Sequence, residues 1–360
     1  MIVGTAAHSN VDHMDWVDVL KGLGILTVVW GHSGSKNAFY MFWFHMPLFF
    51  LVSGYLYRFK PQQKGLAYVQ RKAKHLLVPY VFYLLLITLT MFSVSIWKGQ
   101  STGQFFSDNW IALLFGGSLL EGVYATFWFT TCLFFVQISF DYLCRKVPSS
   151  LNKGLFLVGC YLMAYWESRY LPGMFVPWNL DVALYALVFY GLGHFLRRYK
   201  LLVQQNYRNI LFGLSLVISL GFIYLYSQKI LDYGLDMKHR QYYYFGTSLI
   251  LPLVFSLLLV QLSMILSKWR RLKSLFTLLG RAAMVIMYLH LSSIYLARRM
   301  ITLTPMRVLL IGILVPLAFY KLSQVIPYGR FLALGEAKAR AQTQFTEITP
   351  NNMVPRTVHR

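Results

Sequence analysis

The sequence predicts an all-α, polytopic integral membrane protein with about ten transmembrane helices. Of its 360 residues, 57% are hydrophobic and 13% are charged, whereas an average soluble domain has about 45–50% apolar and about 25% charged residues. The apolar residues form continuous runs, such as 76–97, 210–226 and 243–266, that are long enough to cross a bilayer core. Because these runs are continuous, and because a backbone in hydrocarbon must satisfy its own hydrogen bonds, helices are favoured over barrel strands.

The apolar pattern divides the chain into ten expected helices and two terminal segments. The helices are expected at 16–34, 39–57, 76–97, 125–144, 154–168, 180–196, 209–227, 243–266, 282–298 and 303–323. Polar and Gly-rich stretches between 98 and 125 predict a re-entrant or interfacial piece. We therefore expect a polar N-terminal segment at 1–14 without the features of a cleaved signal peptide, a membrane domain at 15–329, and a cytoplasmic, disordered tail at 330–360.

Basic residues are in large excess, with 34 Lys and Arg against 12 Asp and Glu. They are scattered in short clusters between the apolar runs, so we expect no nucleic-acid partner and interpret them as cytoplasmic loop signals. With both termini in the cytoplasm, the basic residues left on the opposite side are Lys36, Lys98, Arg169, Lys229, Lys238, Arg240, Arg298, Arg299 and Arg307. The weak point of this orientation is the ninth expected helix, at whose end Arg298 and Arg299 lie on the wrong side.

Cysteine and metal chemistry are not indicated. Cys132, Cys144 and Cys160 lie in or at the ends of apolar stretches, where packed thiols are the usual interpretation. The sequence has no CxxC pattern and no disulfide framework, so we expect no metal site.

The first expected helix carries charged groups inside an otherwise apolar span, which marks a candidate functional site. Lys21 and His32 are eleven residues apart, a spacing that returns to within about 20° of the same helix face and rises about 16 Å. Asp18, three residues before Lys21, can pair with its ammonium group. We therefore expect Asp18 and Lys21 near the cytoplasmic surface and His32 halfway across the bilayer or deeper, with all three as candidate catalytic residues.

The second expected helix contains His45 and the pair Ser53-Gly54. Gly54 permits close approach of another helix, and Ser53 either packs there or takes part in a site. The basic cluster that follows, with Arg71, Lys72 and Lys74, is either a positive-inside anchor or a cytoplasmic cradle for phosphates.

Four more polar or aromatic residues are weaker candidates for substrate contacts. Glu121 is either a pore-lining carboxylate or a loop acid, and Trp128 is either a core aromatic or a platform for a sugar. Asp181 opens an apolar helix, where a helix cap is an equally good interpretation. His290, at the end of a helix, is either structural or part of the site.

The chain resembles the membrane-bound acyltransferase family 3, and within it the fucose 4-O-acetylase-like branch that modifies bacterial polysaccharides. The resemblance rests on DVLKGLGILTVVWGH, FHMPLFFLVSGYLYR, RKAKHLLVPY, FWFTTCLFF, WNLDVALYALVFYGLG and LLGRAAMVIMYLH, in the family's order. The family's first-helix motif is Arg, ten residues, then His. Here Lys21 stands at the Arg position and His32 at the His, and Lys lacks the planar fork of Arg.

The resemblance implies an O-acetyltransferase of the bacterial inner membrane that uses acetyl-CoA as co-substrate and holds no permanent cofactor. Its acceptor would be a cell-surface polysaccharide or a lipid-linked sugar precursor, and membrane lipids would be its surroundings. By the same resemblance, Ser53-Gly54 ends the family's FFxxSG motif and Arg71 with Lys74 stands where the family has a CoA-contacting pair. His32 has the chemistry of a base or a nucleophile.

Two other classes compete with this interpretation. A transporter or flippase of a lipid-linked glycan would have a similar number of helices, although the sequence shows no internal repeat of the kind that many transporters have. A structural or sensory membrane protein would have no use for the costly stripe of Asp18, Lys21 and His32.

Overall fold

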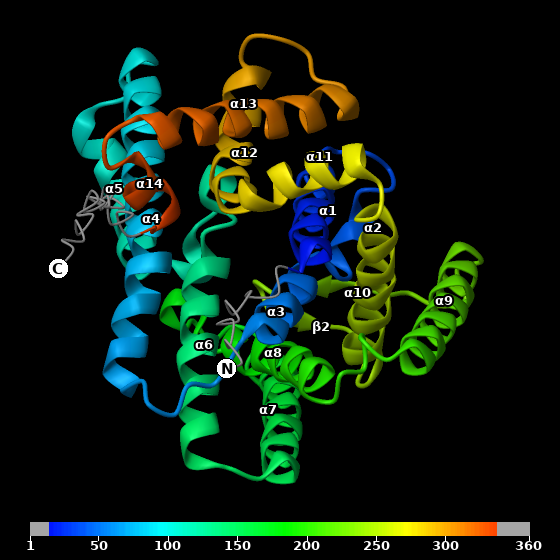
Figure 1. Ribbon diagram of the computed structural model, residues 1–360. Helices are drawn as coiled ribbons and strands as arrows, with labels where there is room; N and C mark the ends of the chain where they lie inside the picture. The colour runs from blue at the N-terminus through cyan, green and yellow to red at the C-terminus, as the bar shows by residue number, and fades with distance from the viewer. Residues whose placement is uncertain (1–13, 337–360) are drawn as a thin grey trace, which may run out of the picture.

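The computed structural model describes residues 14–336, almost all of them in helices (Figure 1). The only strands in this part of the chain are β1 (Leu235–Asp236) and β2 (Gln241–Tyr242), which pair as a short antiparallel hairpin. The all-α class is therefore confirmed. The calls on residues 1–13 and 337–360 lie outside the described residues.

Each of the ten expected helices has a counterpart. These are α1 (Asp15–Gly31), α2 (Phe39–Phe42) with α3 (His45–Leu56), α4 (Gly65–Trp97), α6 (Trp128–Lys146), α7 (Ser150–Tyr170), α8 (Val182–Arg198), α9 (Gln205–Ser227), α10 (Thr247–Leu266), α12 (Ala283–Arg298) and α13 (Pro305–Val325). The additional elements are α5 (Thr102–Phe115), η1 (Gly117–Leu119), η2 (Gly122–Tyr124), η3 (Pro177–Asn179), α11 (Arg270–Arg281) and α14 (Gly329–Leu334).

Fewer helices qualify as membrane spans than the ten expected. Within residues 14–336, seven helices are long and apolar enough to cross a bilayer, or eight if α11 and α12, bent by 72° at their junction, form one broken span. The helix α1 has only 17 residues, and α7 carries three charged side chains, Lys153, Glu167 and Arg169. The molecule is thus a polytopic membrane protein, and α1 and α7 are not among the helices that qualify as spans by themselves.

The elements that the apolar pattern did not predict are short or amphipathic. The helix α5 is capped by Ser101, whose hydroxyl accepts a hydrogen bond from the Gln104 amide at 3.2 Å. Its 14 residues fall where an interfacial piece was expected. The helix α14 packs beside α4 (Figure 1). The first residues of the expected tail therefore belong to a helix, α14.

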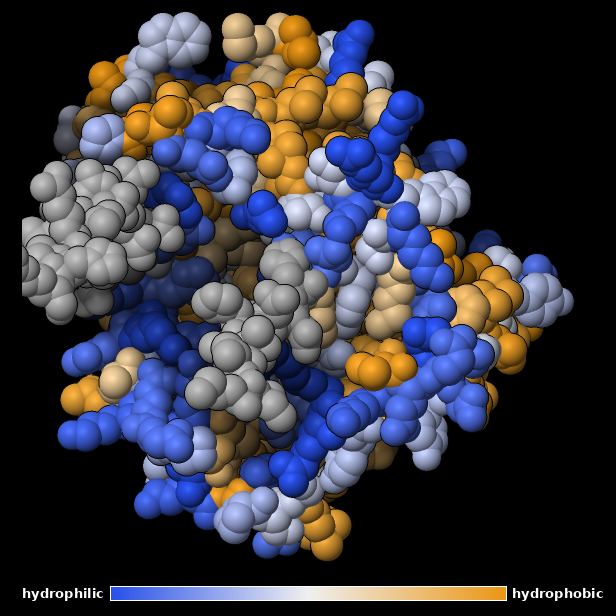
Figure 2. Space-filling model, viewed as in Figure 1, coloured by the Kyte–Doolittle hydropathy of each residue, from blue (hydrophilic) through white to orange (hydrophobic). Residues whose placement is uncertain are grey.

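Apolar side chains face outward on the peripheral helices. In the face shown in Figure 2, hydrophobic residues gather along the upper and right margins, where α13 and α9 lie in Figure 1. Val217 on α9 is 70% exposed and Leu314 on α13 is 57% exposed. A helix surface of this kind fits lipid rather than water.

Glycines let the central helices approach closely. A Cβ on Gly54 of α3 would overlap the Tyr190 carbonyl of α8, and one on Gly193 of α8 would overlap the Leu51 carbonyl of α3. The close approach expected of Gly54 is therefore present. Around α1, the chain places α3, α10, α11, α12 and α13. This arrangement brings residues from both halves of the sequence around one cavity.

Candidate active site

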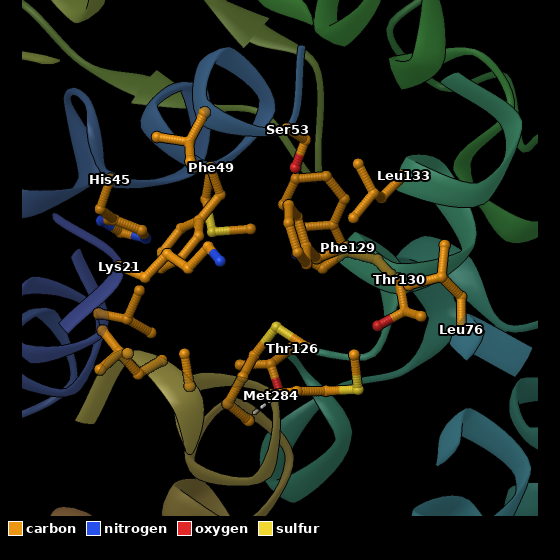
Figure 3. A pocket seen from close by; sticks show the side chains of 18 of the residues that line it. Lys21, His45, Phe49, Ser53, Leu76, Thr126, Phe129, Thr130, Leu133 and Met284 are labelled. Atoms are coloured by element: carbon orange, nitrogen blue, oxygen red, sulfur yellow. Dashed lines mark hydrogen bonds between the residues drawn. The ribbon is translucent and has the colours of Figure 1, made fainter. Parts of the chain in front are cut away.

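A cavity of about 890 Å³ lies between α1, α3, α4, α6 and the α11–α12 bend. Figure 3 shows Lys21 and His45 on one side of it, Phe129 and Thr130 of α6 on the other, and Met284 of α12 below. The cavity has a polar lining at two places. One, here called the basic end, is lined by Asp18, Lys21, Lys72, His75, Arg281, Arg330 and Glu336; the other, the hairpin end, is lined by Glu121, Asp236, Lys238 and His239.

The basic end is built where α1, α11 and α4 meet. The expected ion pair is present, with Lys21 Nζ 3.3 Å from Asp18 Oδ1. The guanidinium of Arg281 lies 3.8 Å from the other oxygen of the same carboxylate. A Cβ on Gly280 would overlap the Asp18 carbonyl, so this glycine allows α11 to reach α1. Lys72 of α4 completes the set of cations on the wall.

The other two members of the RKAK cluster lie off the cavity wall. Arg71 and Lys74 are exposed, whereas Lys72 is half-buried and lines the cavity. The guanidinium of Arg71 lies 5.4 Å from the centre of the Tyr68 ring. The side chain that faces the cavity is therefore the one between the two positions that the family resemblance singled out.

The C-terminal part of the described chain closes one side of the basic end. Arg330 Nε donates to Glu336 Oε2 at 2.8 Å, and both residues line the cavity. Gly335 adopts a positive φ of 63°, and a Cβ there would overlap the His75 backbone of α4. This contact holds α14 against α4 next to Lys72.

The wall between the two ends is mainly apolar, with a few buried polar groups. Ser53 lines the cavity from α3, on the side of the helix away from the glycine contact of its neighbour. Trp128 is 5% exposed and also lines the cavity. Gln137 of α6 is 7% exposed, and its side-chain oxygen has no hydrogen-bond partner in the described structure. This amide, which the sequence did not single out, has an acceptor available to a ligand.

His32 directly follows α1 and lines the cavity. Its ring lies 5.4 Å, centre to centre, from Phe42 at right angles and 5.3 Å from the ring of His290. The expected stripe is therefore present, because Asp18, Lys21 and His32 all line one cavity. Lys21 and His32 are about 16 Å apart along the helix axis, so they serve different parts of the cavity.

Two further histidines flank His32, each with one ring nitrogen held by backbone. His45 lines the cavity, and its Nδ1 donates to the Met41 carbonyl. His290 is fully buried behind the wall, with Nδ1 2.9 Å from the Ile286 carbonyl. A carbonyl can only accept, so both rings carry hydrogen on Nδ1 and present Nε2 as an acceptor.

The hairpin end is held by ion pairs that cross large sequence distances. Lys238 Nζ lies 2.6 Å from Glu121 Oε1 and donates to the Leu120 carbonyl at 2.7 Å. His239 has Nε2 3.1 Å from the same Glu121 oxygen and Nδ1 2.7 Å from Asp236 Oδ2. The Glu121 carboxylate is 62% exposed, so it retains room to accept hydrogen bonds from a ligand.

A buried ion-pair network anchors the hairpin to α7 and α8. Arg240, in the hairpin turn, lies 2.7 Å from Glu167 Oε1 and 3.0 Å from Asp181 Oδ2, and all three side chains are less than a tenth exposed. Asp181 also accepts the Val182 amide at 2.9 Å, which caps α8. Asp181 does not line the cavity. Its structural role is to cap α8 and to pair with Arg240.

Among the residues whose side chains the structure describes, no three of His, Cys, Asp or Glu are grouped as metal ligands. The three cysteines are buried free thiols. The site is therefore a membrane-embedded cavity with a cationic end, a histidine group and a mixed acid–base end.

The comparisons with known proteins give the class. The family model described as an acyltransferase domain matches residues 14–320. The chain therefore belongs to this family, the membrane-bound acyltransferase family 3, and is a membrane acyltransferase. A comparison with curated proteins found no match. A comparison with solved structures likewise found none.

Proposed function

We propose that this acyltransferase moves an acetyl group from acetyl-CoA to a hydroxyl of a cell-surface polysaccharide or of its lipid-linked sugar precursor, in a bacterial inner membrane. One observation carries the proposal: a single cavity places His32 between a cationic end and an end rich in hydrogen-bond acceptors. Such a cavity can take an anionic donor at one end and a polyhydroxylated acceptor at the other.

The basic end suits the donor and faces the cytoplasm. The phosphates of CoA are anionic, and Lys and Arg side chains that converge on an anion form charge-assisted hydrogen bonds. Lys21, Lys72 and Arg281 line this end, and Arg71 and Lys74 lie beside it on the exposed face of α4. The pantetheine arm then runs along the apolar wall toward His32.

His32 acts as the base in the transfer. Its imidazole takes the proton from the acceptor hydroxyl, and the resulting oxygen attacks the thioester carbonyl of the donor. The new carbon–oxygen bond forms as the carbon–sulfur bond breaks, and the CoA thiolate takes the proton back from the imidazolium. In the alternative covalent route, the imidazole itself receives the acetyl group and passes it on. Lys21 lies too far from His32 to touch the reacting atoms and belongs to donor binding.

The hairpin end suits the acceptor. Carboxylate and imidazole groups accept hydrogen bonds from sugar hydroxyls, and Glu121, Asp236 and His239 are each more than 40% exposed at this end. The buried Arg240 network fixes the hairpin that carries Asp236 and His239. Trp128 on the adjoining wall adds an aromatic surface.

The test measures the acetyl content of surface glycan by mass spectrometry in cells that carry the wild type, a deletion, or a well-expressed His32→Ala variant. We expect both the deletion and the variant to lose acetyl esters. A Lys229→Gln variant, which changes an exposed base away from the cavity, serves as the control and keeps them. Full acetylation in His32→Ala would remove His32 from the mechanism.

One observation favours a second candidate, a transporter or flippase of a lipid-linked glycan: the cavity has polar groups at both ends. That function predicts unchanged acetylation in the deletion strain and an altered distribution of the lipid-linked glycan between the two leaflets. Measuring both quantities in the same strain separates the two candidates.

A further inference from the structure

A second pocket, of about 730 Å³, lies where α1 and α12 end and α13 begins. Ser33 and Gly34 line it on one side and Arg298 and Arg299 on the other. The helices α1 and α12 start at the basic end, and α13 finishes there, because Lys21, Arg281 and Gln324 line the cavity at those termini. The pocket is therefore at the opposite end of these helices, on the side that the proposed orientation makes extracytoplasmic.

Arg298 and Arg299 lie on the side of the membrane where basic residues are disfavoured, and they differ from Lys238 and Arg240 there in lacking a carboxylate partner among the described residues. Basic residues are retained on the cytoplasmic side during insertion. Lys238 is paired with Glu121, and Arg240 with Asp181. Neither Arg298 nor Arg299 forms an ion pair with a carboxylate whose side chain the structure describes. Among the described side chains, therefore, no carboxylate neutralises their charge.

The guanidinium group of Arg299 is held in place by Tyr295. Arg299 donates to the Tyr295 hydroxyl at 2.7 Å and lies 4.9 Å from the centre of that ring. Lys98, at the end of α4, approaches the same hydroxyl. Guanidinium groups present several donors in a plane, so most of those on Arg298 and Arg299 remain available. This is the arrangement that binds phosphate oxygens in pairs.

The rest of the pocket is aliphatic. Met300 is 84% exposed and Ile301 is 49% exposed, and both line the pocket together with Leu303 and Pro305. Exposed apolar side chains next to two cations without a carboxylate partner among the described residues are suited to bind a ligand with an acyl or isoprenoid chain and an anionic head. A free inorganic anion would need no such aliphatic surface.

The pocket also borders the reaction centre. Ser33 follows His32 directly, and Gly34 comes next, so the pocket wall and the cavity wall share a stretch of chain only a few ångströms long. A group attached to a phosphate in this pocket has a short path to His32.

We propose that Arg298 and Arg299 bind the phosphate of a lipid-linked saccharide, so that the acceptor is a lipid phosphate and not a finished polymer. Its hydrocarbon chain lies against Met300 and Ile301, and its sugar reaches over Ser33 toward His32. This inference rests on the proposed function, because it names the acceptor class for the same reaction. The same phosphate chemistry could come from bulk phospholipid, which the test below separates.

The test measures binding of farnesyl phosphate, a single-chain lipid phosphate, to the purified full-length protein in nanodiscs of phosphatidylcholine. The comparison ligand is farnesol, which has the same chain without the phosphate. The variants are the double substitution Arg298→Gln with Arg299→Gln, the conservative pair Arg298→Lys with Arg299→Lys, and Lys229→Gln as the control. The wild type is also tested in nanodiscs that contain phosphatidylglycerol.

We expect farnesyl phosphate to bind at least about tenfold more tightly than farnesol, and the double Gln variant to lose about tenfold or more. The double Lys variant should retain part of the affinity, and Lys229→Gln all of it. Equal binding of both ligands, unchanged binding in the double Gln variant, or complete competition by phosphatidylglycerol would each overturn the proposal. The double Gln protein is checked for folding by its melting temperature.

This outcome is distinguishable from failure of the proposed function. Binding of farnesyl phosphate needs no acetyl-CoA and no reaction, so a His32→Ala protein should bind it as the wild type does. If binding follows the arginines while the deletion strain keeps its acetyl esters, the lipid-phosphate site stands and the acetyltransferase proposal fails. If the esters are lost but the arginines do not affect binding, only this inference fails.

Discussion

The two ends of the cavity are held together in different ways. At the basic end the cations outnumber the carboxylates, because Lys21, Lys72, Arg281 and Arg330 face only Asp18 and Glu336 among the described residues, and the ion pair of Asp18 with Lys21 is local. At the hairpin end, Lys238 and Arg240 are each matched by carboxylates distant in sequence. Cations in excess of the neighbouring carboxylates are available to bind an anionic ligand, whereas ion pairs between distant residues fix a loop in place. The basic end is therefore organised to receive an anion, and the hairpin end to present a fixed polar surface.

Among the substitutions that test this comparison, Arg240→Ala should have the largest effect on stability. The substitution leaves the Glu167 and Asp181 carboxylates buried without their cation, and breaking a buried ion pair in this way costs about 3–5 kcal/mol. We expect a melting temperature far below that of the wild type, measured by thermal unfolding in detergent. The exposed Arg270→Ala on α11 is the control. A melting temperature equal to that of the control would show that the hairpin is not anchored by this network.

A smaller loss is expected at the basic end from Gly280→Ala. The new methyl group would overlap the Asp18 carbonyl, and overpacking of this kind costs about 1–3 kcal/mol. Gly213→Ala on α9, where a Cβ meets nothing within 4 Å, is the matched control. Thermal unfolding of both proteins measures the difference. Equal stability of the two would mean that α11 can move away from α1 freely.

Next in size is the loss of a single cation at the basic end. Lys72→Gln should weaken CoA binding by about tenfold, the size of one charge-assisted hydrogen bond. Lys74→Gln, two residues along the helix and off the cavity wall, should change it by less than about twofold. Isothermal titration of both variants with CoA gives the ratio. A larger loss in Lys74→Gln would place the phosphates on the exposed face of α4.

The smallest effect should come from Glu121→Gln at the hairpin end. The carboxylate is 62% exposed, whereas Lys238 is 7% exposed. Because a Gln side chain keeps an acceptor oxygen and Lys238 keeps its bond to the Leu120 carbonyl, the loss of stability is expected to be about 1 kcal/mol. We expect an almost unchanged melting temperature and CoA affinity, with a raised KM for the acceptor. Steady-state kinetics with donor and acceptor varied separately check this, and a raised KM for the donor would contradict the division between the two ends.

The sequence predicted the parts of the site that depend on local geometry. Asp18, Lys21 and His32 share one wall because eleven residues return a helix to the same face. The choice among Arg71, Lys72 and Lys74 was not predictable in this way, because neighbouring residues differ by about 100° in direction and the rotation of α4 is set by the burial of its own Tyr68 and Leu76. Only the structure shows that Lys72 faces the cavity.

The hairpin end could not be predicted from the sequence, for a different reason. Its strands have two residues each, too few to produce a period, and Lys238 reaches Glu121 across 117 positions. Asp181 was balanced between a cap and a site because its partner, Arg240, lies in that same hairpin. The amphipathic α11 was missed as well, because a search for apolar runs passes over a helix with one apolar face.

The position of α1 has a consequence for how the protein is made. Among the described helices α1 is synthesised before the others, yet most of its neighbours are α10, α11, α12 and α13, which follow much later in the chain. His32 meets His290 only after α12 has been inserted. Until then, a short helix with two acidic side chains and a lysine must remain in the bilayer without the helices that enclose it. The cavity wall around His32 is therefore completed late in synthesis, after the helices that enclose α1 have been inserted.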